Sequence, residues 1–89
     1  MEKDTEKYLN DEVKKLGGLC VKFPPLFFRG FPDRIVLLSG AVIVFVELKD
    51  AGRKPSKIQE RVHAKLRGLG FRVEVLDGKD EVKGFMSTL

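Results

Sequence analysis

The spacing of apolar and polar positions along the chain predicts an alternation of helices and strands. In residues 4–16, Leu9, Val13 and Leu16 recur at helical spacing, and the pattern ends at Gly17-Gly18. Mostly apolar or alternating stretches, bounded by glycine, proline and short polar residues, predict four strands. They lie at 19–23, 33–38, 42–49 and 71–76.

Two further helices complete the pattern. Ser56 and Gln59 match a capping box, which predicts a helix from residue 56 towards Leu66, ending near Gly68 or Gly70. Residues 80–86 predict a short final helix after an Asp77-Gly78 turn. The predicted order is therefore αβββαβα.

Three charged residues interrupt the two most apolar strands. Asp33 precedes the first strand, and Glu47 and Lys49 end the second, on one face because side chains alternate along a strand. With a three-residue loop at 39–41, Asp33 lies directly opposite Glu47, whereas a two-residue loop would shift the register by one. Like charges facing each other repel, at a Cβ separation of about 5 Å.

A divalent cation between the two carboxylates would remove this repulsion. Mg²⁺ or Mn²⁺ prefers oxygen ligands, which Asp33, Glu47 and the backbone carbonyl of Leu48 could supply. Lys49 would stand beside the attacking water, either orienting it or stabilising charge on a phosphate. The sequence thus predicts a metal-dependent hydrolytic site.

These motifs resemble a known family. Pro32-Asp33, then Glu47-Leu48-Lys49, looks like the PD-(D/E)XK nuclease core, and residues 30–38 and 44–49 with Gln59 look like its VRR-NUC branch, in its stand-alone phage or bacterial form. The resemblance implies an α/β fold with an αβββαβ core, in which helices flank a mixed central sheet. It also implies a glutamate from the first helix in the metal site. Glu6 is preferred for that role, with Glu2 as the alternative.

Gln59 has two interpretations. It could serve only as the capping-box partner of Ser56, or it could join the site and touch Lys49, water or phosphate, as the resemblance implies. One rotamer is not expected to satisfy both. His63 is taken as a surface or boundary residue without a role, and Cys20 as a strand residue rather than a nucleophile, because no base is evident beside it.

Composition and charge agree with a nucleic-acid enzyme. The 89 residues suit one domain, 1–89, and the formal net charge is +4. Residues 49–72 hold eight basic and two acidic residues, a local charge of +6 that favours phosphate binding. A solvated helix face is the alternative. The expected DNA-binding residues are Arg29, Arg53, Lys54, Lys57 and Arg61.

The single cysteine and the absence of a signal peptide or an apolar span suggest the cytoplasm of a bacterium or phage-infected cell. The loop 24–31 and Phe23 together hold four phenylalanines. If exposed, these rings would mark an interface; otherwise some of them fill a small core. Small size, this loop and the resemblance together favour a homodimer.

The prediction is a Mg²⁺- or Mn²⁺-dependent DNA endonuclease that hydrolyses phosphodiesters. Asp33, Glu47, Lys49 and Gln59 are its catalytic residues. Two sites related by a two-fold axis would suit symmetric cuts in a four-way (Holliday) junction. The alternatives are a flap or non-selective nicking nuclease, an inactive DNA-binding module, and a docking subunit with the same fold.

Overall fold

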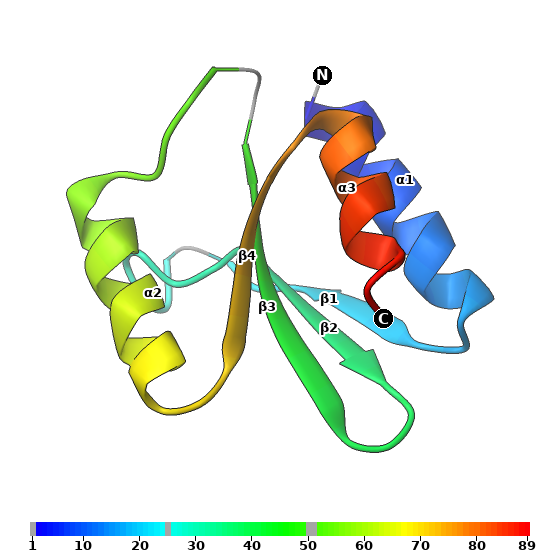
Figure 1. Cartoon of the computed structure of the whole chain (residues 1–89). Coiled ribbons are helices and arrows are strands. Elements are labelled where there is room, and N and C mark those ends of the chain that lie inside the picture. Colours follow the sequence, from blue (N-terminus) through cyan, green and yellow to red (C-terminus); the bar gives the residue numbers. More distant parts are fainter. Residues whose placement is uncertain (1, 25, 50–51) are drawn as a thin grey trace.

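The computed structural model describes residues 2–24, 26–49 and 52–89, and for Glu2 the backbone alone. Seven elements follow the predicted order αβββαβα (Figure 1). They are α1 (Glu2–Lys15), β1 (Leu19–Lys22), β2 (Arg34–Leu38), β3 (Val42–Lys49), α2 (Lys57–Gly68), β4 (Arg72–Asp77) and α3 (Gly78–Met86).

The strands form one mixed sheet in the order β1-β2-β3-β4. The first three are antiparallel neighbours. β3 and β4 are parallel, because α2 carries the chain back to the end of the sheet at which β3 begins. In Figure 1 the sheet stands between α2 on one side and the α1–α3 pair on the other. The predicted α/β fold class, with helices flanking a mixed sheet, is confirmed.

The β2–β3 hairpin has the register expected from a three-residue loop. Leu38 pairs with Val42 and Ile35 with Phe45, across a turn at residues 39–41. Gly40 and Ala41 take the left-handed φ values of 82° and 62° that allow this tight reversal. Extending the same register by one pair places Asp33 opposite Glu47.

Apolar residues fill both sides of the sheet. Val36, Val44, Val46 and Leu48 pack against α1 and α3, together with Leu9 and Val13, which are fully buried. Phe45 and Val73 face the other way, towards Leu66 of α2. Leu16, expected on the buried face of the first helix, is instead 52% exposed, because α1 ends at Lys15 and the chain turns there.

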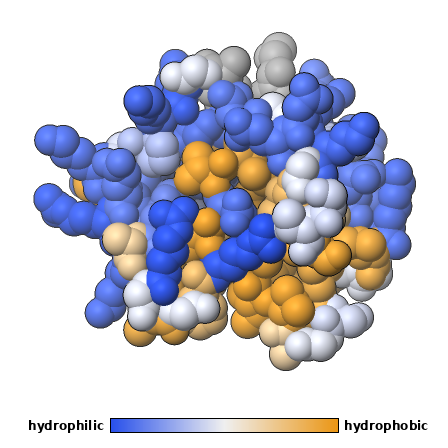
Figure 2. All heavy atoms as spheres, viewed as in Figure 1, coloured by the Kyte–Doolittle hydropathy of each residue, from blue (hydrophilic) through white to orange (hydrophobic). Residues whose placement is uncertain are grey.

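No described helix has both the length and the apolar character needed to cross a bilayer. Figure 2 shows hydrophilic side chains spread over α2, on the left, and apolar side chains gathered at the hairpin end of β2 and β3. The predicted loop at 50–55 is described only from Gly52 onward; Asp50 and Ala51 lie outside the described residues, as does Pro25.

Candidate active site

The predicted carboxylates meet on the face of the sheet that α2 covers. Asp33 comes directly before β2, and its Oδ1 accepts a hydrogen bond of 3.3 Å from the backbone N–H of Leu48. This contact ties the start of β2 to the end of β3. Strand alternation turns Glu47 and Lys49 to the same side, where the two side chains form an ion pair of 3.7 Å.

Glu47 is the most unusual carboxylate among the described residues. Only 4% of the residue is exposed, in a strand with both faces covered. The pKa of Glu47 is raised from 4.5 to about 7, mainly by burial and then by the charge of Asp33, with a smaller opposing effect of Lys49. Without a cation, therefore, a large fraction of Glu47 is protonated near neutral pH.

Gln59 connects the helix cap to the site. Its Oε1 accepts hydrogen bonds of 2.9 Å from the backbone N–H of Ser56 and of 2.9 Å from Lys49 Nζ. Its Nε2 donates to Glu47 Oε2 at 3.3 Å. The expectation that one rotamer could not serve both roles was wrong, because an amide oxygen can accept two hydrogen bonds. The capping box is therefore part of the site.

The prediction of a surface or boundary position for His63 was wrong. It is 2% exposed, and its Nε2 lies 4.0 Å from Glu47 Oε1. Neither atom has a hydrogen-bond partner among the described residues. Burial lowers the pKa of His63 from 6.5, helped by the nearby charges of Arg67 and Lys49, so the ring is neutral at neutral pH. The signal in the sequence was its spacing, four residues after Gln59 and thus on the same helix face.

Arg34 is a second residue that the sequence reasoning missed. It is 3% exposed on the face opposite Glu47, where Nη2 donates to Glu6 of α1. Its Nη1 donates to the backbone carbonyl of Asp33 at 2.9 Å and lies 3.6 Å from Asp33 Oδ1. A charged residue inside an apolar strand was the available signal. Glu6 is thus linked to Asp33 through Arg34, and the side chain of Glu2 lies outside the described residues.

The chemistry of these groups fits a divalent cation. Asp33 and Glu47 offer carboxylate oxygens on one face, and the buried Oε1 of Glu47 has no hydrogen-bond donor among the described residues. The described part of the chain holds no cluster of three or more His, Cys, Asp or Glu side chains with ligand geometry. A hard ion such as Mg²⁺ commonly binds one or two protein carboxylates and keeps several waters, so two are sufficient.

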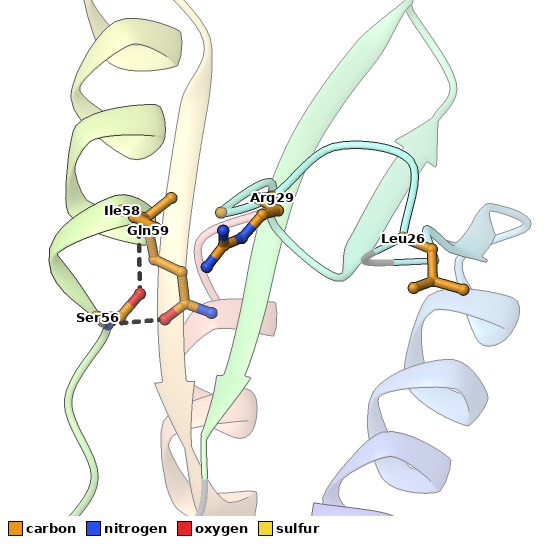
Figure 3. A pocket seen from close by; sticks show the side chains of 6 residues that line it. Leu26, Arg29, Ser56, Ile58 and Gln59 are labelled. Carbon is orange, nitrogen blue, oxygen red and sulfur yellow. Dashed lines mark hydrogen bonds between the residues drawn. The ribbon is translucent and has the colours of Figure 1, made fainter.

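A hollow opens beside Gln59. It has a volume of about 450 Å³ and lies between the loop after β1 and the start of α2. Figure 3 shows Arg29 from the loop and Gln59 from the helix pointing towards one another, with Leu26 further along the loop. The other predicted DNA-binding residues, Arg53, Lys54, Lys57 and Arg61, are exposed, and none has an ion pair with another described residue.

The aromatic loop contains both partly buried and exposed rings. Phe23 and Phe31 are half-buried and stack with centroids 4.7 Å apart, and Phe31 meets the core ring of Phe45 at 5.3 Å. Phe27 and Phe28 are 78% and 52% exposed. Cys20 remains a poor nucleophile, because burial raises the pKa of its thiol to about 11.

Comparisons with known proteins agree with this geometry. No family model matches the chain. "Putative nuclease p44" of Acyrthosiphon pisum secondary endosymbiont phage 1 is 48% identical over 79 residues, which cover 89% of this chain and 85% of that protein. A solved VRR_NUC domain superimposes with a TM-score of 0.90 and 34% identity, covering 97% of this chain and 94% of that one.

Proposed function

Because the chain belongs to the VRR-NUC family of nucleases, we propose that it is a metal-dependent DNA endonuclease acting by phosphodiester hydrolysis. The proposal is based on the clustering of Asp33, Glu47 and Lys49 on one face of the sheet, where Gln59 of α2 contacts Lys49 and Glu47. Burying the Glu47 carboxylate beside Asp33 and in an ion pair with Lys49 costs free energy, and folding alone does not require it. A catalytic use accounts for the arrangement.

Asp33, Glu47 and the Leu48 carbonyl would hold the Mg²⁺ or Mn²⁺ ion. Glu6 is the candidate for an additional carboxylate, with Glu2 as the alternative, and Glu6 would have to turn away from Arg34 to reach the ion. When bound, the ion polarises the scissile phosphate and lowers the pKa of water at the site.

Lys49 would position the attacking water and stabilise charge on the phosphate. Its ammonium group has three N–H donors, of which one is held by Gln59 Oε1 at 2.9 Å. That hydrogen bond fixes the ammonium group, which also lies 3.7 Å from Glu47 Oε2. In the reaction, a water oxygen forms a bond to phosphorus, and the bond from phosphorus to the leaving ester oxygen breaks.

The substrate is proposed to be branched DNA, in particular the four-way (Holliday) junction, cut by a homodimer with two sites. Arg29, Arg53, Lys54, Lys57 and Arg61 would contact phosphates, because all five are exposed cations and Arg29 lines the hollow beside Gln59. We further propose that residues 1–89 act as one nuclease domain. The phage origin of the similar protein supports action in the cytoplasm of a bacterial or infected cell.

The test is cleavage of four-way, flap, nicked and linear DNA by the wild-type protein, with Mg²⁺, with Mn²⁺ and with EDTA. Cleavage should require the metal and be fastest on the four-way junction. Glu47→Ala and Lys49→Ala should each lower the rate by at least 10²-fold, as expected for loss of a metal ligand or a preorganised charge. Full activity of Glu47→Ala would contradict the assignment of these residues as the active site.

The other outcomes identify the alternatives. A preference for flaps, or equal cutting of every DNA, would retain the enzyme and replace the substrate. Metal-independent DNA binding without cleavage would indicate an inactive binding module. Neither binding nor cleavage would indicate a docking subunit.

A further inference from the structure

A second hollow lies further along α2 and is almost wholly apolar. It has a volume of about 340 Å³ between the aromatic loop and the helix, with Phe28, Phe31, Val62 and Leu66 in its lining. Arg61 and Lys65 also line it, and no acidic residue does. We refer to this hollow as the aromatic groove.

The ring at its edge is held by other rings. Phe28 contacts Phe31 with centroids 5.3 Å apart, and Phe31 packs edge-on against Phe45 at 5.3 Å. Phe45 is 8% exposed and belongs to the core between the sheet and α2. Phe28 is therefore supported from one side by Phe31, while 52% of the residue remains exposed and available to an aromatic ligand.

The positive charge beside the aromatic groove indicates which kind of ligand could bind there. Arg61 and Lys65 are four residues apart on α2, so they lie on the same helix face, one turn apart. Two cations beside an aromatic surface match a ligand with alternating anionic groups and π faces, which is single-stranded nucleic acid. A purely apolar partner would leave both cations without a counterpart.

The groove is also close to the proposed site of cleavage. Gln59, which contacts Lys49 and Glu47, precedes Val62 and Lys65 by three and six residues on the same helix. At about 1.5 Å per residue this is roughly 5–9 Å along the axis. One strand of stacked DNA advances about 3.4 Å per nucleotide, so the interval is about one to three nucleotides.

We propose that the aromatic groove binds one unpaired base of the DNA, stacked on Phe28, with its neighbouring phosphates on Arg61 and Lys65. This inference rests on the proposed nuclease function and narrows its substrate class. The favoured DNA has an unpaired nucleotide one to three positions from the scissile phosphate. Such nucleotides occur at flaps and at opened branch points but not in intact duplex.

The test combines a protein change with a DNA change. Single-turnover cleavage with Mg²⁺ is measured for wild type and Phe28→Ala, on substrates with one unpaired nucleotide at one, two or three positions from the cut. Each substrate is paired with one in which that nucleotide is abasic. At the best position, Phe28→Ala should slow cleavage at least fivefold, the lower end of what stacking one base contributes.

The abasic substrate separates stacking from general damage. If the base stacks on Phe28, removing the base costs the wild type the same factor, and Phe28→Ala then cuts the abasic DNA no more slowly than wild type does. If the protein change and the abasic nucleotide each slow cleavage independently, so that their factors multiply, the proposal is overturned. It is also overturned if Phe28→Ala slows cleavage at none of the three positions. Phe27→Ala is the matched control: Phe27 is 78% exposed in the same loop but does not line the groove, so its rates should equal those of wild type.

Two additional measurements test the phosphate contact and the state of association. Lys65→Ala should reduce the slope of log affinity against log salt by about 1, as expected for one lost phosphate contact. Light scattering should give Phe28→Ala the same mass as wild type; a lower mass would mean that a second copy of the chain occupies the groove, which overturns the proposal. If wild type cuts no DNA at all, the proposed function itself fails.

Discussion

At the scale of single residues, Glu47 is a carboxylate whose burial opposes its ionisation, whereas binding a cation requires the ionised form. The strand buries its carboxylate beside Asp33, which raises its pKa to about 7. The sequence predicted that Asp33 and Glu47 face one another if the hairpin loop has three residues, and the structure has the register of such a loop. It did not reveal His63 or Arg34, whose burial depends on which elements pack above and below the sheet.

The protein without metal should lose stability as pH rises through the pKa of Glu47. Since the folded state binds this proton more tightly than the unfolded state, the stabilisation is complete below about pH 4.5 and lost by about pH 7. The slope attributable to Glu47 is up to about 1.4 kcal/mol per pH unit. Urea unfolding in EDTA should therefore show Glu47→Gln equal to wild type at pH 4.5 and more stable at pH 8.

His63 makes this comparison necessary. Burial lowers its pKa, so its own effect on stability runs in the opposite direction, increasing with pH. His63 is present in both proteins, and the difference between them isolates Glu47. A difference that does not depend on pH would contradict the raised pKa.

Gln59→Glu should separate the cap from the site. Glutamate also completes a capping box, so α2 keeps its N-terminal hydrogen bonds. The new carboxylate, however, replaces the N–H donor to Glu47 with a negative charge. At pH 5, where Glu47 is protonated, urea unfolding should give stability close to wild type, whereas cleavage at pH 8 should be at least tenfold slower.

Ser56→Ala is the converse control. It removes the cap hydrogen bond of 3.2 Å to the Gln59 N–H and should cost about 1 kcal/mol of stability. The contacts of Gln59 with Lys49 and Glu47 remain, so cleavage should continue at nearly the wild-type rate. If Ser56→Ala loses activity and Gln59→Glu keeps it, the site role of Gln59 is wrong.

At the scale of elements, boundaries were predictable where a local signal marks them. The capping box predicted the start of α2 correctly. The hairpin loop predicted the end of β2 and the start of β3. Leu16 was expected in the core because helical spacing continues through it, but the helix ends at Lys15. Spacing alone does not show where the chain leaves the helix axis.

The loop after β1 is held to α2 by a close contact at Gly30. Its φ is +83°, and a Cβ there would lie 2.8 Å from the Ile58 carbonyl oxygen. Arg29 faces the hollow beside Gln59, and Phe28 faces the aromatic groove. The positions of both therefore depend on this contact between loop and helix.

Gly30→Ala should displace the loop and reduce cleavage at least tenfold, because Arg29 and Phe28 move together. Gly40→Ala is the matched control: Gly40 has a φ of +82° but nothing within 4 Å of a new Cβ. Both variants should lose about 1–2 kcal/mol of stability to left-handed backbone, measured by urea unfolding. Gly30→Ala should lose more because of the contact with Ile58, and Gly40→Ala should cleave normally. Equal activity of the two variants would contradict the role of the loop contact.

At the scale of the whole molecule, the packing of α2 on the sheet brings the residues of the candidate active site together. The carboxylates and Lys49 come from the β2–β3 hairpin, and α2 covers the same face of the sheet. α2 is part of the crossover that returns the chain from β3 to the parallel strand β4. The result is one face that holds the carboxylates, the lysine, the buried histidine and the basic helix.

A homodimer is the prediction at this scale. Leu16, Val42 and Leu89 remain 52%, 41% and 39% exposed, and they line an apolar hollow at the hairpin end, where Figure 2 shows apolar side chains gathered. Exposed apolar surface of this kind favours association. Light scattering at micromolar concentration should give twice the chain mass, and junction cleavage should yield paired cuts. A single-chain mass at every concentration would contradict the dimer.

The sequence by itself determined the order of elements and, for a three-residue loop, the hairpin register and the pairing of Asp33 with Glu47. Each of these depends on neighbours in the chain: spacing, turn residues, and alternation along a strand. Only the tertiary structure decided that His63 is buried against Glu47, that Arg34 connects Glu6 to Asp33, and that Gln59 serves the cap and the site together. These contacts join elements distant in sequence, and their geometry follows from the packing of α1 and α2 on opposite faces of the sheet.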